Sequence, residues 1–287
     1  MRICITTGSR IHLGFHTFPP SKAAWSGAGV YLSEPRLVLC YDTHGDWLEV
    51  EEDIPRHRGL GSTTQRLLAE AKLHAYIRGE VFDWRRTVLV KGRYKTSRVG
   101  ALLFRYGGLV IDGTRDPHKS LKPLVRMRLP RHFRFVLVDP RLPRGPSEQE
   151  ESLIWDNMPA ASPRLSREGR RAAVKLAEAA LKGDATSFLE AAVMLDRVTG
   201  SYFSGIQGGG SRSDILGLQE AARGLGIVLM QSSWGPVMYT VADSKGARRI
   251  ARLLRGLLDR MGLEGRVWIA RPRNRGAFLH AGPGIAR

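Results

Sequence analysis

Residues 56–68 read RHRGLGSTTQRLL and place two glycines and three hydroxyl side chains directly before an amphipathic segment. Gly59 and Gly61 permit a positive φ and close approach of the backbone, and Ser62 suits the cap of the helix that follows. A helix start presents unpaired N–H groups with partial positive charge, so the stretch predicts an anion-binding loop. The alternative is an ordinary glycine loop with a good N-cap. The stretch is neither a Walker A motif nor a dinucleotide fingerprint, whose spacings differ.

The pattern around this loop changes from strand to helix. Up to residue 50, apolar and polar positions alternate between Gly, Pro and Ser, which predicts an antiparallel β-meander with strands over residues 2–7, 11–18, 28–32, 36–41 and 46–50. From residue 62 to residue 77 the apolar side chains recur at helical spacing, and Gly79 can end that helix. The loop therefore enters a helix after a region of strands.

The rest of the chain alternates helices with short strands. Further strands are predicted over residues 87–90, 108–112, 131–139, 227–231, 237–242 and 266–270. Helices are predicted over residues 97–105, 166–182, 186–198, 213–224 and 245–261. Residues 139–151, with three prolines after Asp139, read as a surface loop. The pattern indicates an α+β fold with one domain over residues 1–128 and a second over residues 129–287.

The net charge of +18, from 45 basic and 27 acidic residues, favours polyanionic partners or substrates with several phosphates. The arginines are scattered and no nucleic-acid motif accompanies them, which disfavours a nucleic-acid-binding protein. No stretch approaches 18 uninterrupted apolar residues, and the N-terminus lacks a signal-peptide pattern. We therefore expect no membrane partner and a cytoplasmic location.

The two cysteines, Cys4 and Cys40, lie in apolar, strand-like runs without other metal-ligating residues beside them. This pattern suggests neither a disulfide framework nor a zinc site. We expect buried, inert thiols.

Arg10 and His12 are two residues apart on a predicted strand, so their side chains share one face. Two groups that can carry positive charge, close to Gly14, predict a site for a carboxylate or a phosphate, which arginine can bind through two hydrogen bonds. A solvated strand face is the alternative. We take Arg10 and His12 as candidate catalytic residues.

Motifs in the same order as those of one known superfamily accompany the loop. They are residues 10–15 (RIHLGF), 27–35, 92–93, 97–100, 107–113 (GGLVIDG), 202–203, 207–209 and, most specific of all, 231–239 (QSSWGPVMY). With the loop, they resemble the GHMP small-molecule kinase superfamily, and Gly-Leu-Gly-Ser-x-Thr-Gln resembles its non-kinase branch of archaeal β-ribofuranosylaminobenzene 5′-phosphate synthases. The resemblance implies a two-domain fold with a ribosomal S5 domain 2-like N-terminal domain and a ferredoxin-like α/β-plait C-terminal domain.

The sequence departs from the superfamily pattern in three places. Thr63-Thr64-Gln65 replaces the Ser-Ala-Ala usual in the kinases, Thr96 stands where a basic residue is expected, and Thr114 replaces a second glycine. These departures bear on the identity of the substrate more than on the fold.

The resemblance also implies an activity and its site. Synthases of this branch join phosphoribosyl pyrophosphate to a para-substituted benzoate, here 4-hydroxybenzoate or 4-aminobenzoate, with loss of pyrophosphate and CO2. The implied phosphate-binding residues are Gly59, Leu60, Gly61, Ser62, Thr63 and Thr64. The implied substrate-binding residues are Arg93, Ser97, Gln207, Gln231, Ser232, Ser233 and Trp234. Trp234 could form a wall for the aromatic ring, or it could pack between domains.

Mg²⁺ is the expected cofactor, because it would neutralise charge that develops on a departing pyrophosphate. Asp112 and Asp139 are candidate ligands, although aspartates at strand ends are common turn-formers, and we assign no ligand set. His57 could donate to a phosphate or act as an acid, or it could be a solvated loop histidine. The flanking Arg56, Arg58 and Arg66 are candidates for positive charge around the ligand.

Two other functions remain open at this point. An ATP-dependent GHMP kinase of a small alcohol fits the loop, but Trp234 replaces the glycine-rich third motif of the kinases. A nucleic-acid-binding protein would explain the charge but predicts clustered arginines and exposed aromatic residues. The expected partners are a phosphorylated sugar and an aromatic acid, and the resemblance favours a homodimer.

Overall fold

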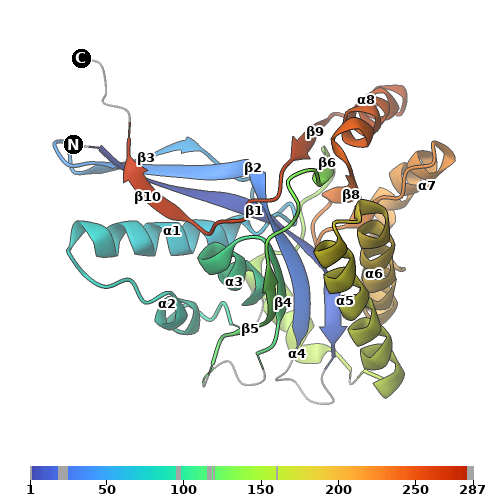
Figure 1. Ribbon diagram of the computed structural model, residues 1–287, viewed down its shortest axis with the longest axis horizontal. Helices are drawn as coiled ribbons and strands as arrows, with labels where there is room; N and C mark the ends of the chain where they lie inside the picture. The colour runs from blue at the N-terminus through green and yellow to red at the C-terminus, as the bar shows by residue number, and fades with distance from the viewer. Residues whose placement is uncertain are drawn as a thin grey trace.

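The computed structural model describes residues 2–18, 25–94, 98–114, 118, 120–159 and 161–282, and its strands form two antiparallel sheets (Figure 1). The first sheet has the order β10-β1-β2-β4-β5 with β3 beside β2, and contains β1 (Arg2–Thr17), β2 (Ser26–Asp42), β3 (Trp47–Glu52), β4 (Leu109–Asp112), β5 (Pro123–Met127) and β10 (Phe278–Ala281). The second has the order β7-β8-β6-β9, and contains β6 (Arg134–Pro140), β7 (Met230–Gln231), β8 (Met238–Ala242) and β9 (Gly265–Ala270). Helices pack on both sheets, which confirms the predicted α+β class.

β1 and β2 form one long hairpin, where we predicted four short strands. Their pairing is irregular between Gly8 and Ser9 and again between His12 and Gly14. A bulge bends a strand and increases its twist without ending the pairing, so these breaks in the sequence pattern are bends within a strand. The second bend lies beside His12, and therefore beside one of the candidate catalytic residues.

α1 (Ser62–Ile77) and α3 (Arg98–Tyr106) pack on the first sheet, and α2 (Trp84–Val90) packs against these two helices. The structure confirms the helix predicted over residues 62–77, and Leu68 and Leu73 of α1 lie in the core. The strand predicted over residues 87–90 is wrong. The side chain of Asp83 accepts hydrogen bonds from the backbone N–H groups of Arg85 and Arg86, and this cap starts a helix through a valine-rich segment.

The second sheet lies between two pairs of helices. Phe135 and Leu137 of β6 share a core with α5 (Pro163–Lys182) and α6 (Ala185–Gln207), whereas Val136 and Val138 pack with α7 (Leu216–Gly224) and α8 (Ser244–Arg260). Successive side chains of a strand point to opposite faces, so β6 has apolar residues at every central position. The run of apolar residues that predicted this strand thus reflects burial on both faces.

Some predicted boundaries were wrong. α6 continues to Gln207, nine residues beyond its predicted end, and β5 and β10 were not predicted. α4 (Glu148–Asn157) begins inside the predicted surface loop, where Ser147 and Glu150 form a capping box. We predicted a loop for the whole stretch because of its prolines. The prolines belong only to the loop that precedes the helix.

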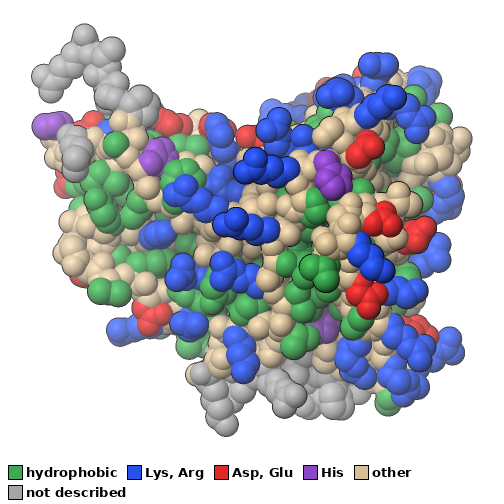
Figure 2. Space-filling view, in the orientation of Figure 1, with side chains coloured by type: hydrophobic (Ala, Val, Ile, Leu, Met, Phe, Trp, Pro, Cys, Tyr) green, Lys and Arg blue, Asp and Glu red, His purple; other side chains and the backbone are tan. Residues whose placement is uncertain are grey.

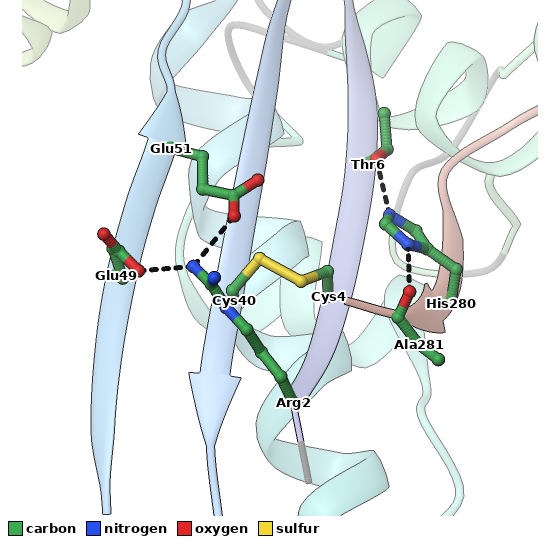
Figure 3. Close-up of a disulfide and its surroundings, with 8 residues drawn as sticks. All are labelled: Arg2, Cys4, Thr6, Cys40, Glu49, Glu51, His280 and Ala281. Carbon is green, nitrogen blue, oxygen red and sulfur yellow. Dashed lines mark hydrogen bonds and ion pairs between the residues drawn. A yellow bond between two sulfur atoms is a disulfide. The ribbon is translucent and has the colours of Figure 1, made fainter. Parts of the chain in front are cut away.

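Cys4 and Cys40 form a disulfide between β1 and β2 (Figure 3), so the prediction of free thiols was wrong. The two residues are directly opposite each other in the register of the hairpin. Beside the bridge, Arg2 forms ion pairs with Glu49 and Glu51 of β3. We missed the bond because cysteines 36 positions apart show no pairing pattern until the hairpin register is known.

The division between residues 128 and 129 stays a prediction. Almost all strands of the first sheet precede it and those of the second follow it, but β10 returns from the second segment to pair with β1. One hydrophobic core also joins Leu68 of the first segment to Leu176 and Leu195 of the second. The two segments are therefore closely packed together.

Lys and Arg side chains are spread across the visible face, with fewer acidic side chains among them (Figure 2). No described helix is long and apolar enough to cross a membrane.

Candidate functional site

The loop of residues 57–64 lines a cleft together with Gly145, Pro146 and Glu151 and the turn after β7. We call it the loop cleft. Its lining includes five of the six predicted phosphate-binding residues: Gly59, Gly61, Ser62, Thr63 and Thr64. Leu60 is fully buried, its side chain belongs to the core, and its carbonyl accepts the backbone N–H of Arg10 at 3.0 Å. Leu60 therefore anchors the loop.

Backbone contacts hold the loop against the turn after β7. Gly59 has φ +90°, and a Cβ there would lie 2.1 Å from the carbonyl oxygen of Ser232. On the facing side, a Cβ at Gly235 would lie 2.0 Å from the carbonyl carbon of Arg58. His57 and Ser233 both have positive φ, 55° and 56°, which side-chain-bearing residues rarely adopt. The two turns thus interlock through positions where glycine is required.

The start of α1 opens into the loop cleft with its backbone donors uncapped by side chains. Gly61, at φ +74°, is the N-cap, and no side chain of the described residues caps the helix, so the predicted capping role of Ser62 is wrong. The first turn carries no acidic residue. Exposed N–H groups and the partial positive charge of a helix start favour an anion at this point.

Arg10 lies at the floor of the loop cleft. Its Nη1 donates to the carbonyl of Gly59 at 3.2 Å, and its Nε is buried without a hydrogen-bond partner among the described residues. Burial lowers the pKa of Arg10 to about 10, against an attraction from Glu151, so the guanidinium is still charged at neutral pH. A buried donor without a partner costs free energy, and an anionic ligand would satisfy it.

His12 lies on the same face of β1 as Arg10, and both line a small pocket that also contains Phe15, Trp155 and Asp112. Burial, followed by the charges of Arg10 and His16, holds the pKa of His12 well below 6.5. The imidazole is therefore neutral at pH 7, and the expectation that it adds positive charge is wrong. The indole Nε1 of Trp155 is buried and, like Arg10 Nε, has no partner among the described residues. We call this space the arginine pocket.

Arg93 also lines the loop cleft, where its Nε donates to the hydroxyl of Thr64 at 3.3 Å. It lies close enough to Arg10 for the two charges to repel. Ser97, the other residue predicted from this segment, lies outside the described residues, as does Thr96.

The arginines that flank the loop in sequence do not line the loop cleft. Arg58 is held by Asp139, with its Nε 2.7 Å from the carboxylate, and by the carbonyl of Leu142. Arg66 is paired with Asp53 at 2.9 Å. Their predicted role as charge around the ligand is wrong, because they form ion pairs with Asp139 and Asp53 of the same chain. His57, by contrast, does line the loop cleft.

Gln231 and Ser232 hold the turn after β7 in shape. The amide of Gln231 accepts the backbone N–H of Arg212 at 3.0 Å and donates to the carbonyl of Ser233 at 2.8 Å. The hydroxyl of Ser232 accepts the backbone N–H of His12 and donates to the carbonyl of Gly59 at 2.8 Å. These side chains thus connect β1, the loop and the turn. Ser232 is fully buried, whereas Gln231 also lines a pocket that it shares with Trp234.

Trp234 and Ser233 line two neighbouring spaces, the loop cleft and a second pocket that we call the aromatic pocket. The rings of His12, Phe15 and Phe203 also line the aromatic pocket. Trp234 meets Phe203 edge to face at 4.6 Å between ring centroids. An aromatic wall beside an anion site is what the proposed stacking role requires, and that role stays a prediction.

Gln207 lines the aromatic pocket as the last residue of α6, and its amide donates to the carbonyl of Gly210 at 3.1 Å. The helix ends at this residue, and Gly208 is its cap. Asp196, which precedes Gln207 on α6, also lines this pocket, and we did not predict it from the sequence. Asp196 belongs to no motif. Its place in the sequence of an amphipathic helix is one that a solvent-exposed acid would also occupy.

The two aspartates considered as metal ligands are both engaged. Asp112 pairs with Arg98 at 2.9 Å and accepts the backbone N–H of Thr114, and Asp139 is bound by Arg58. Among the described residues there is no group of three or more His, Cys, Asp or Glu that could hold a metal ion.

Comparison with known proteins places the chain beside two archaeal enzymes. It is 27% identical to a β-ribofuranosylphenol 5′-phosphate synthase of Methanothermobacter thermautotrophicus over an alignment of 339 positions, which covers 97% of this chain and 99% of that protein. It is 29% identical to the protein of the same name from Archaeoglobus fulgidus, over 83% of this chain and 78% of that protein. No protein-family model matches the chain.

Solved structures share the fold at low sequence identity. A homoserine kinase from Cytophaga hutchinsonii has a TM-score of 0.69 at 13% identity over 97% of both chains. A mevalonate diphosphate decarboxylase from Staphylococcus aureus has a TM-score of 0.64 at 12% identity, over 97% of this chain and 98% of that one. The predicted GHMP-kinase-like fold is thereby confirmed. Over nearly its whole length the chain is thus similar in sequence to β-ribofuranosylphenol 5′-phosphate synthases, and it shares its fold with these kinase and decarboxylase structures.

Proposed function

We propose that the protein is a transferase that condenses phosphoribosyl pyrophosphate with 4-hydroxybenzoate and releases pyrophosphate and CO2. The observation that carries the proposal is the end-to-end similarity to enzymes named β-ribofuranosylphenol 5′-phosphate synthase. A phenol as product favours 4-hydroxybenzoate, with its para hydroxyl, over 4-aminobenzoate.

The shape of the site supports two substrates of different character. The loop cleft offers backbone donors, Ser62, Thr63 and two arginines for a pyrophosphate, and the adjoining aromatic pocket offers flat apolar walls. Trp234 borders both, so a ring in the pocket and a phosphate in the cleft would meet near this residue. Holding two reactants in contact removes much of the entropic barrier to a bimolecular reaction.

Arg10 would stabilise charge at the meeting point. It lines both the loop cleft and the arginine pocket, and its unpartnered Nε can donate to an anionic oxygen. The benzoate carboxylate is one such group, and the unpartnered Nε1 of Trp155 could donate to it as well. The neutral His12 would take part as a hydrogen-bonding group and not as a charge.

Mg²⁺ would fit this site as a metal held mainly by pyrophosphate. Mg²⁺ commonly binds through one or two carboxylates together with substrate phosphates and water. Glu151 is the acid that lines the loop cleft, so it is our candidate ligand beside the hydroxyls of Ser62 and Thr63. When bound, the metal would neutralise charge on the departing pyrophosphate.

The test is incubation of the protein with phosphoribosyl pyrophosphate, Mg²⁺ and 4-hydroxybenzoate labelled in its carboxyl group. We expect labelled CO2 and pyrophosphate in equal amounts. ATP turnover with small alcohols is the parallel assay, because kinases share the fold. Absence of labelled CO2 with either benzoate, under conditions in which the protein is folded, would refute the proposal.

We infer a cytoplasmic location from the phosphorylated sugar substrate, and a homodimer from the family resemblance. Sedimentation of the purified protein tests the second point, because a dimer of a 31.9 kDa chain has twice that mass.

A further inference from the structure

The aromatic pocket contains a carboxylic acid among its ring-lined walls. Asp196 of α6 lines the pocket with His12, Phe15, Phe203 and Trp234. No ion pair among the described residues includes Asp196, unlike the engaged Asp112 and Asp139. An acid without a cationic partner in a largely apolar pocket is costly to ionise, so its presence calls for a chemical reason.

Burial raises the pKa of Asp196, and the polar groups around it oppose that effect only in part. The backbone N–H of Gln231 donates to the carboxylate, and the buried hydroxyl of Tyr239, from β8, lies close enough to interact with it electrostatically. The neighbouring Arg197 is exposed and attracts it weakly, while His12 from β1 is neutral. Burial dominates and raises the pKa of Asp196 to about 7. A group with such a pKa can both take and return a proton near neutral pH.

We propose that Asp196 is the catalytic base that takes the proton from the para hydroxyl of the aromatic substrate. This inference rests on the proposed function. It assigns the aromatic pocket to a para-hydroxylated benzoate, with the ring among His12, Phe15 and Trp234 and the hydroxyl at Asp196.

The proton transfer balances the reaction. As the O–H proton moves to Asp196, the electron pair of that bond enters the ring. The ring carbon that carries the carboxylate then forms a bond to the anomeric carbon of the ribose, while the bond from the anomeric carbon to pyrophosphate breaks. The ring is then a cyclohexadienone that still carries the carboxylate. When the bond to the carboxylate breaks, CO2 leaves, its electron pair restores the aromatic ring, and the phenolate oxygen takes the proton back from Asp196. No oxidant or reductant is needed.

His12 lines the same pocket but is a poorer candidate for this base. Burial and the charge of Arg10 hold the pKa of His12 well below 6.5, so its imidazole takes up a proton less readily than Asp196 does. A phenol has a pKa of about 10, and a base closer to that value takes its proton with a smaller free-energy cost. Arg10 itself is charged and has no acceptor.

The experiment compares Asp196→Asn with Glu190→Gln, an exposed acid on the same helix, and with Asp196→Glu, which keeps the carboxyl group. Each variant is first checked for a native thermal transition. With carboxyl-labelled 4-hydroxybenzoate, we expect kcat of Asp196→Asn to fall by about 10²–10⁴-fold with a smaller change in KM. Asp196→Glu should recover part of the loss, and Glu190→Gln should match the wild type.

The pH profile supplies a readout that a structural role would not change. Because the ionised form of Asp196 is the base, kcat/KM of the wild type should fall below about pH 7, and this acid limb should be absent in Asp196→Asn. Calorimetry adds a measurement without turnover: Asp196→Asn should weaken binding of 4-hydroxybenzoate and leave that of benzoate, which lacks the hydroxyl, unchanged.

The outcomes separate the two proposals. A wild type without CO2 release refutes the proposed function and this inference with it. An active wild type whose Asp196→Asn variant keeps kcat within about threefold, or keeps the acid limb, refutes only the role of Asp196.

Discussion

The loop cleft and the aromatic pocket share Trp234 but are built in different ways. The cleft is made largely of backbone, with Gly59 and Gly61 at positive φ and the uncapped start of α1, and its shape depends on interlocking turns. The pocket is made of side chains, four aromatic rings and Asp196, brought from β1, α6 and the turn after β7. Backbone donors suit an anion of any identity, whereas side chains decide which ring fits and what happens to its protons. Substitutions in the cleft should therefore lower activity by changing the shape of its backbone. In the pocket, removal of a single side-chain group should be enough to lower activity.

Among changes to the loop cleft, the largest effect should come from Gly59→Ala. Its Cβ would lie 2.1 Å from the carbonyl oxygen of Ser232, at a φ that disfavours alanine, so the loop must move out of the cleft. We expect CO2 release to fall by at least about 10²–10³-fold, as when an anion loses backbone donors. The matched control is Gly79→Ala, which also has positive φ but has no described atom within 4 Å of its Cβ. That variant should lose about 1 kcal/mol of stability and keep its activity, and equal activity of both variants would contradict the interlocking of the turns.

A smaller effect should follow Arg10→Lys, which keeps the charge but removes the planar donor group. We expect a loss of about 10–100-fold in kcat/KM, the value of one hydrogen bond to a charged ligand. The measurement is steady-state CO2 release, with Arg56→Lys, an exposed arginine that does not line the cleft, as the control. Full activity of Arg10→Lys would show that Arg10 Nε does not donate to the ligand.

Trp234→Leu should affect the aromatic substrate alone. Removal of the ring wall should raise KM for 4-hydroxybenzoate about tenfold and leave KM for phosphoribosyl pyrophosphate within about twofold. Trp234→Phe should recover most of the affinity, because it keeps an aromatic surface. A change in both KM values would indicate that Trp234 supports the cleft as well as the pocket.

The smallest effect on activity should come from the double variant Cys4→Ser, Cys40→Ser. The bridge lies on the β1–β2 hairpin, and neither cysteine lines the loop cleft or the aromatic pocket, so turnover at a temperature where the protein is folded should not change. Bridging residues 36 apart restricts the unfolded chain, and its loss should lower the free energy of unfolding by about 2–4 kcal/mol. Denaturant titration measures this, and a reducing agent should produce the same change in the wild type but none in the variant.

The site was predictable where it depends on local backbone. Gly59, Gly61 and the helix after them predicted the geometry of the loop, because positive φ and helix starts are set by adjacent residues. The partners of Arg58 and Arg66 were not predictable, because Asp139 and Asp53 reach them only after folding. These arginines are close to the loop in sequence, but their side chains point to Asp139 and Asp53 and not into the loop cleft.

The sequence by itself determined the α+β class, the loop-to-helix junction at Gly59–Ser62 and, through its motifs, the GHMP-type fold. These features follow from local φ preferences and from the period of apolar residues, which neighbouring positions encode. The tertiary structure alone decided that Cys4 meets Cys40, that His12 is buried and neutral, and that Asp196 joins Trp234 in one pocket. Pairing, burial and proton affinity depend on what residues far apart in the chain bring to the same place, and no local pattern records that.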